Sequence, residues 1–122
     1  MEFDPSQAWY HGSPRVLTAL QVGSTITQKR ELARIFSHKP SLVSAENDGR
    51  LRHNGRQPGY LYRVEGVRPG DVIPHPQTSM QPGEEWLTTR ELLLVLLEPT
   101  TVVAEELLTE EELSALMGRM GN

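Results

Sequence analysis

The sequence predicts one α+β domain with a largely antiparallel sheet. Period-two alternation marks residues 60–65 as a strand, and apolar residues at i, i+3 and i+4 mark a helix that begins near Thr27. The order of elements is strand, helix and then mostly strands, which does not alternate as a doubly wound fold does. At 122 residues the chain suffices for one hydrophobic core. We therefore expect a single domain over residues 1–122, with its core at about 8–104.

The first strand is expected over residues 8–11, ended by Gly12 and Pro14. Residues 16–20 read as one helical turn or a packed loop. Thr27 is the expected N-cap of the helix, because its hydroxyl can accept from the amides of the first turn. The helix has Leu32, Ile35 and Phe36 on its apolar face and ends at Lys39-Pro40.

Residues 44–59 read as a long loop, either disordered or functional. In the strand that follows, Tyr60, Tyr62 and Val64 form the predicted core face, and Leu61 shares the wet face with Arg63 and Glu65.

Further along the chain we expect a turn at residues 68–71 and a brief strand at 72–73. Residues 92–97 are uniformly apolar, which predicts a strand buried on both faces. Pro99 is expected to interrupt it, with one more strand at residues 100–104.

An acidic C-terminal helix is predicted over about residues 109–119. Thr109 and Glu112 have the spacing of a capping box. Its inward-facing residues are Leu113, Leu116 and Met117.

The composition of the chain excludes several classes of function. The formal charge of −4 argues against a general nucleic-acid-binding protein. With no cysteine and no histidines at the i, i+4 spacing of a helical metal pair, we expect no metal. His38 is assigned to the dipole of the helix that precedes it, and His53 and His75 are assigned to the surface.

The N-terminus lacks the basic start and apolar run of a secretory signal, and the longest apolar run falls far short of the roughly 20 residues that cross a bilayer. We expect a soluble cytoplasmic protein, with secretion as an effector left open.

Arg50, Arg52 and Arg56 make residues 44–59 locally basic. This pattern fits a ligand that carries phosphate, and it equally fits an ordinary solvated loop.

The segment Trp9-Tyr10-His11-Gly12-Ser13 joins an aromatic strand to a histidine and a glycine. Glycine lets a flat ligand approach the main chain, so His11 is a candidate binding residue. The alternative is a strand that happens to end in histidine.

Three pieces stand in order: Tyr10-His11-Gly12-Ser13, then residues 23–27 leading into residues 31–36, then Glu84-Glu85-Trp86. This set resembles the ADP-ribosyltransferase superfamily, in the branch that begins with a His-Gly-Ser/Thr motif, and most of all its small rifampicin ADP-ribosyltransferases. The poly(ADP-ribose) polymerases and RNA 2'-phosphotransferases share the opening motif. The similarity covers about residues 8–104 and implies a split, mostly antiparallel sheet with a few short helices.

The resemblance implies that His11 holds the ribose of NAD+ and that the main chain of Gly12 meets the nicotinamide carboxamide, with Ser13 nearby. Glu85 resembles the acidic residue that stabilises the oxocarbenium-like sugar and aligns the acceptor. Glu84 is the alternative for that role.

Five further residues are assigned to the cofactor, namely Thr25, Thr27, Tyr62, Arg50 and Arg52. The family's second motif usually carries a Tyr that stacks on nicotinamide, and Thr25 or Ile26 stands there in this chain. Tyr10, Tyr60, Tyr62 and Trp86 are the aromatic residues considered as substitutes for that Tyr.

Two functions follow from the resemblance. One is NAD+-dependent ADP-ribosyl transfer to a small molecule, such as an antibiotic, or to a macromolecule, as a bacterial toxin or effector would perform. The other is an inactive member of the fold that binds a nucleotide or a protein partner. An RNA 2'-phosphotransferase is disfavoured because the chain is acidic.

Overall fold

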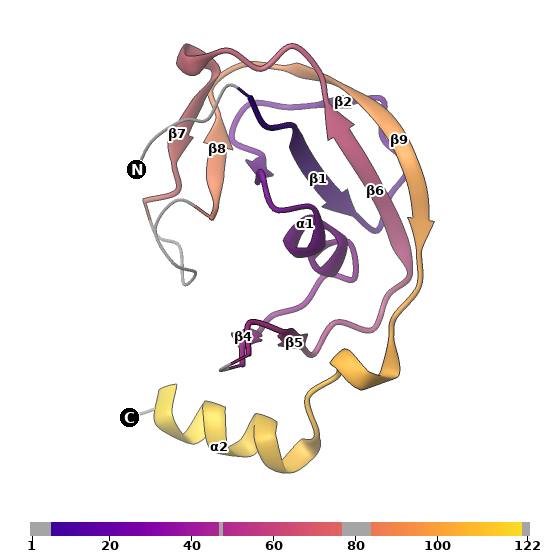
Figure 1. The fold of residues 1–122 in the computed structure, drawn as a ribbon, viewed down its shortest axis with the longest axis vertical. Helices are drawn as coiled ribbons and strands as arrows, with labels where there is room; N and C mark the ends of the chain where they lie inside the picture. The colour runs from indigo at the N-terminus through magenta and orange to yellow at the C-terminus, as the bar shows by residue number, and fades with distance from the viewer. Residues whose placement is uncertain (1–5, 47, 77–83, 121–122) are drawn as a thin grey trace.

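The computed structural model describes residues 6–46, 48–76 and 84–120. It is an α+β domain of mostly antiparallel sheets with two α-helices among these residues, as the sequence predicts. In Figure 1 the larger sheet curves along one side, helix α1 (Arg30–Phe36) lies at the centre, and the C-terminal helix lies at one end.

The larger sheet contains β1 (Trp9–Ser13), β6 (Gly59–Val64), β9 (Leu92–Thr100) and β2 (Ala19–Leu20) in the order β1-β6-β9-β2. The expected end of β1 at His11 is wrong, because the strand continues for two residues and stays paired with β6. β2 is a short strand where a helical turn or a packed loop is expected, and it pairs with β9.

Helix α1 covers one face of this sheet, and this changes the predicted faces of β6. Tyr62 and Val64 are buried as predicted, at 1% and 4% exposed. Leu61, expected on the wet face, is 0% exposed, because α1 packs over β1 and β6 on that side. Arg63, beyond the helix, is exposed.

β9 is one strand with a wet face, so two predictions about it are wrong. Leu93 is 66% and Val95 38% exposed, since α1 contacts β9 toward its other end, at Glu98 and Thr100. Pro99 does not interrupt the strand: it pairs with Tyr60. β2 flanks β9 only at its beginning, so the missing N–H of Pro99 falls where one edge of the strand is open.

The smaller sheet contains β3 (Thr25–Ile26), β8 (Trp86–Thr88) and β7 (Val72–Pro74), in that order. A 3₁₀ turn at Pro69–Asp71 leads into β7, where a turn is predicted. Trp9 and Trp86 meet edge to face between the sheets, with ring centroids 5.6 Å apart. The core between the sheets consists of Trp9, Leu20, Ile26, Val64, Val72, Trp86 and Leu92.

Thr27 is not the N-cap of α1, because the helix begins three residues later. Lys29 is the N-cap and makes no side-chain capping bond. Thr27 Oγ1 instead accepts from the Lys29 N–H at 3.0 Å, which shapes the turn into the helix.

The predicted long loop contains a hairpin of β4 (Val43–Ala45) and β5 (Leu51–His53). The sequence gives little apolar signal here, and the hairpin is held by polar contacts. Asn54 Oδ1, for example, accepts from the main chain of Ser41 and Leu42.

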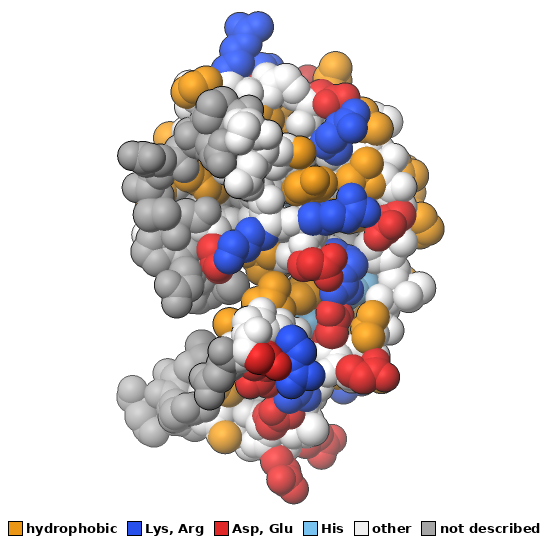
Figure 2. Space-filling view, viewed as in Figure 1, with side chains coloured by type: hydrophobic (Ala, Val, Ile, Leu, Met, Phe, Trp, Pro, Cys, Tyr) orange, Lys and Arg blue, Asp and Glu red, His pale blue; other side chains and the backbone are white. Residues whose placement is uncertain are grey.

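Past β9 the chain forms a 3₁₀ turn at Ala104–Glu106, not the expected strand, and then α2 (Glu110–Met120). The capping box is confirmed: the Thr109 N–H donates to Glu112 Oε1 at 3.0 Å, and the Glu112 N–H donates to Thr109 Oγ1 at 3.1 Å. Leu113 and Leu116 are half-buried, while the Met117 side chain lies outside the described part. Figure 2 shows acidic side chains gathered at this end of the molecule.

Among the described residues, no helix is long and apolar enough to cross a membrane.

Candidate functional site

The two sheets are joined by main-chain hydrogen bonds where β1 passes the end of β3. Tyr10 of β1 and Thr27, just after β3, exchange main-chain hydrogen bonds of 2.7 and 3.0 Å. From this pair β3 turns to β8, while β1 continues beside β6. The sheet therefore opens between β1 and β3, next to the sequence motif that begins at His11.

His11 spans this opening. Its Nδ1 lies 2.7 Å from the Thr25 carbonyl oxygen, which can only accept, so the neutral ring carries its proton on Nδ1. Nε2 is then an acceptor. Burial lowers the pKa of His11 from its ordinary value, and the bond to Thr25 opposes this shift. The structure thus holds a neutral imidazole in one tautomer.

Two features of Gly12 matter at this opening: the direction of its main-chain groups and its lack of a side chain. In an antiparallel ladder, alternate residues direct their N–H and C=O to alternate edges. Tyr10 directs both groups to Thr27, so Gly12 presents its own at the same edge, where β3 has turned away. A Cβ at Gly12 would also lie 1.8 Å from the Ala33 carbonyl oxygen, so only glycine lets α1 pack this closely.

Ser13 and the second-motif threonines have structural partners. Ser13 is 7% exposed, and its hydroxyl accepts from the Arg15 N–H at 3.1 Å. Thr25 supplies the carbonyl that holds His11. Thr27, 1% exposed, joins the sheets through its main chain.

Glu84 and Glu85 directly precede β8, on the far side of β3 from β1. Glu84 forms an ion pair with Lys29. The Glu85 carbonyl accepts from the His75 N–H at 3.1 Å, which extends the β7–β8 pairing. Continuing the β3–β8 register by one residue sets Glu85 opposite Thr27, and two strand spacings put it roughly 10 Å of backbone from Tyr10. The Glu84 ion pair therefore ties the segment before β8 to the N-cap residue of α1, and Glu85 follows it next to the strand.

Most aromatic residues near the opening are engaged elsewhere. Tyr62 is buried, and its hydroxyl accepts from the Leu17 N–H and donates to the Arg15 carbonyl. Trp86 lies in the core. The Tyr10 ring faces the Arg30 guanidinium, 5.9 Å from the ring centroid. Tyr60 is half-buried and shares a sheet face with His11, because it pairs with Ser13.

The structure does not place Arg50 and Arg52 with His11. They line a cavity of about 260 Å³ between α1, the β4–β5 hairpin and the 3₁₀ turn at Ala104–Glu106. Arg50 pairs with Asp48 at 2.7 Å. Arg52 binds Glu46, Glu112 and the Leu107 carbonyl, so it fastens the C-terminal segment to the hairpin.

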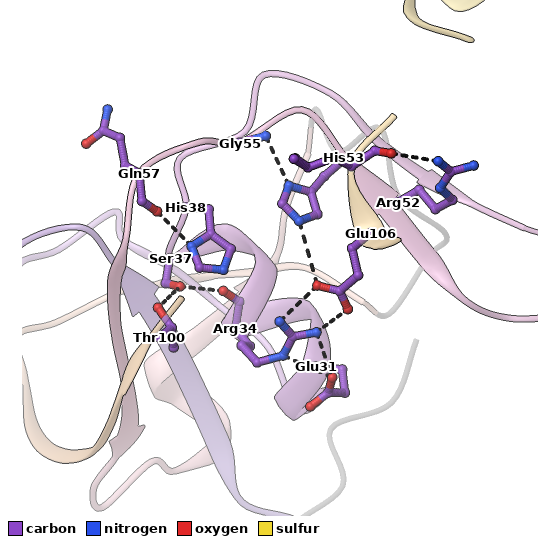
Figure 3. Close-up of polar contacts among 11 residues, drawn as sticks. Glu31, Arg34, Ser37, His38, Arg52, His53, Gly55, Gln57, Thr100 and Glu106 are labelled. Carbon is purple, nitrogen blue, oxygen red and sulfur yellow. Dashed lines mark hydrogen bonds and ion pairs between the residues drawn. The ribbon is translucent and has the colours of Figure 1, made fainter. Parts of the chain in front are cut away.

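A buried histidine pair lies beside that cavity, and the prediction that His53 is a surface residue is wrong. His38 and His53 are each 0% exposed, with ring centroids 5.6 Å apart and planes 17° apart. Figure 3 shows them between α1 and Glu106. His38 Nδ1 donates to the Gln57 carbonyl at 2.7 Å, so its ring binds a loop and not the helix end. The short β4–β5 hairpin buries both rings. In the sequence, the one indication of this burial is the pair of glycines on either side of residues 56–58, Gly55 and Gly59.

Comparison with known proteins gives no relative: no family model, curated protein or solved structure matches the chain. In the described part of the chain, no group of three or more His, Cys, Asp or Glu side chains is arranged to hold a metal ion.

Proposed function

We propose that this protein transfers ADP-ribose from NAD+ to an acceptor, and that its two sheets are the split sheet of an ADP-ribosyltransferase-like fold. One observation carries the proposal. The sheet opens between β1 and β3 directly after the Tyr10–Thr27 pair, and the same opening holds the His11 ring, bound to Thr25, and the outward main-chain groups of Gly12.

These groups complement the nicotinamide riboside half of NAD+. A carboxamide carries one acceptor oxygen and an NH2 donor, which match the N–H and C=O of one extended residue. Gly12 offers that pair. His11 Nε2, an acceptor in the tautomer fixed by Thr25, accepts from a ribose hydroxyl one residue away along the strand.

Glu85 supplies the charge that the reaction needs. As the bond between nicotinamide and the ribose breaks, its electron pair leaves with nicotinamide and positive charge develops on the sugar. A fixed carboxylate stabilises that charge. The acceptor then bonds to the ribose carbon and releases its proton to water, so the products are the ADP-ribosylated acceptor, neutral nicotinamide and one proton. Glu85 is proposed for this role because it directly precedes β8 and lies opposite Thr27 when the β3–β8 register is continued by one residue.

A second candidate function is a nucleotide- or protein-binding module without catalysis. The position of the family's stacking tyrosine holds Thr25 or Ile26, and Trp86 and Tyr62 are committed to the core. A nicotinamide ring that is not stacked is held less firmly in the geometry that bond cleavage requires.

Calorimetry with NAD+, followed by an assay of nicotinamide release, distinguishes the two functions. The transferase account predicts binding and release by the wild type, weakened binding by His11→Ala, and binding with little release by Glu85→Gln. Binding without release by the wild type supports the binding module. If the wild type neither binds NAD+ nor releases nicotinamide, the transferase proposal is wrong.

A further inference from the structure

The C-terminal segment, residues 104–116, is attached to the domain largely around His53. Leu107 forms a parallel bridge with His53, and the Leu108 N–H donates to the His53 carbonyl at 2.9 Å. Leu108 is 4% exposed. Arg52, the preceding residue, donates to the Leu107 carbonyl at 2.6 Å. The main chain of His53 and the side chain of Arg52 therefore hold this segment in place.

The His53 ring is held as a neutral imidazole by a main-chain donor. The Gly55 N–H donates to His53 Nδ1 at 3.0 Å, so the neutral ring carries its proton on Nε2. An imidazolium carries protons on both nitrogens. Protonation therefore sets an N–H on Nδ1 against the Gly55 N–H and breaks this bond.

Gly55 cannot easily retreat from that contact. A Cβ at Gly55 would lie 2.7 Å from the His38 carbonyl oxygen and 2.9 Å from His38 Cβ, so its main chain packs directly on His38. The turn at residues 53–55 must then shift to admit a second proton, and the same turn carries the carbonyl that Leu108 binds.

The charges around His53 compensate an added proton only in part, because Glu106 raises the pKa of His53 while His38 and Arg34 lower it. Glu106 Oε1 is 3.9 Å from His53 Nε2, but both Glu106 oxygens are hydrogen-bonded to Arg34. Arg34 itself also binds Glu31. Figure 3 shows this arrangement. The groups near His53 are His38 and Arg34 from α1 and the residues after it, Glu106 from the 3₁₀ turn, and Arg52 with its partners Glu46 and Glu112.

We propose that His53 is a pH-sensitive latch, which holds residues 104–116 on the domain at neutral pH and loosens them under mildly acidic conditions. Neutral His53 keeps the Gly55 bond and the Leu108 bond together. Protonated His53 loses the first and, through the shift of the turn, weakens the second. Glu106, which Arg34 also holds, opposes this loosening only in part.

The direction of the pH dependence follows from the burial of the ring. Burial, together with His38, lowers the pKa of His53 below its ordinary value of 6.5. The attached state then binds fewer protons than the detached state. The attachment is fully stable above about pH 6.5 and weakens as the pH falls toward the pKa of the attached form, by up to about tenfold per pH unit for one proton.

Amide hydrogen exchange of Leu108, corrected for intrinsic rates, tests the latch in the full chain. We expect its protection factor to fall about tenfold between pH 7.5 and pH 5.5, and to stay well below that of Tyr62 in the core at both pH values. His53→Asn keeps an acceptor for the Gly55 N–H and does not titrate, so its Leu108 protection should not change with pH. His75→Asn, at a histidine outside this cluster, should behave as the wild type.

An unchanged protection factor in the wild type overturns the proposal, as does an equal pH response in His53→Asn. If His53→Asn does not fold, NMR titration of the wild-type His53 ring decides, and a pKa at or above 6.5 overturns the latch. Equal protection factors for Leu108 and Tyr62 mean that both amides exchange through global unfolding, and this also overturns the proposal.

Discussion

His11 is held in one tautomer by the main chain of β3. Its Nδ1 donates to the Thr25 carbonyl at 2.7 Å, which leaves Nε2 as the acceptor at the opening between the sheets. Under the proposed function, protonation would convert this acceptor to a donor and add a positive charge next to the cationic nicotinamide ring of NAD+. We therefore expect the neutral ring to be the form that binds NAD+.

We predict that NAD+ affinity is constant above about pH 6.5 and weakens only below it, because burial lowers the pKa of His11 from its ordinary value of 6.5. Below the pKa of the free protein, the dissociation constant should rise by up to about tenfold per pH unit. Calorimetry across this pH range measures it. An affinity that rises on acidification contradicts the assigned tautomer.

Among single residues, the sequence indicates His11 and Gly12 as candidate binding residues, because a strand pattern is followed there directly by turn residues. It does not identify His38 and His53 as a pair. Their contact depends on the hairpin that brings residues 53–55 onto the end of α1. A tertiary contact of this kind cannot be predicted from local residue patterns.

Helix α1 packs so closely on β1 that the contact depends on Gly12. A Cβ there would lie 1.8 Å from the Ala33 carbonyl oxygen, which belongs to helix backbone and cannot rotate away.

We predict that Gly12→Ala lowers the free energy of unfolding by about 2 kcal/mol or more. Gly70→Ala is the matched control, because a Cβ at Gly70 meets nothing within 4 Å, and its effect should stay within about 0.5 kcal/mol. Urea unfolding of both variants measures the difference. Equal stabilities would show that α1 does not pack on β1 in this way.

The turn before β7 is fastened to the turn before β9 by Asp71. Its carboxylate accepts from the Arg90 side chain at 2.7 and 3.1 Å and from the Arg68 N–H at 2.8 Å. The Arg90 hydrogen bonds lower the pKa of Asp71 from its ordinary value of 3.8.

Because that pKa is lowered in the folded state, the contribution of Asp71 to stability is complete above about pH 3.8 and is lost as the pH falls through the folded-state pKa. We predict that Asp71→Asn is less stable than the wild type at neutral pH, and that the difference narrows in acid. Thermal unfolding of both proteins at several pH values measures this. A stability difference that does not change with pH would show that the charge of Asp71 does not stabilise the fold.

Elements with a regular pattern are predicted well, and those shaped by tertiary neighbours are not. β6 and the capping box of α2 follow from periodicity and spacing. The hairpin of β4 and β5 has too few apolar residues to signal itself. The sequence also does not reveal that β9 has a face exposed to solvent, because the face of an apolar strand that is covered depends on where α1 ends.

At the scale of the whole molecule, α1 lies between the two regions of interest. Its face over Gly12 adjoins the opening between the sheets, and its Arg34 binds Glu106 beside the histidine pair. The fold class follows from the order of elements, because that order survives local errors in their bounds. The order of elements does not predict that Arg50 and Arg52 line a separate cavity. Distance along the sequence does not tell which side of α1 the hairpin packs against.

The measurement that tests the central proposal most directly is nicotinamide release from NAD+ by a matched pair of variants, Glu85→Gln and Glu84→Gln. The transferase account predicts a rate for Glu85→Gln about 10²–10³-fold below that of the wild type, with NAD+ affinity largely retained. Glu84→Gln should keep most of the activity, since Glu84 binds Lys29. Wild-type rates for Glu85→Gln, or no release by the wild type, would contradict it.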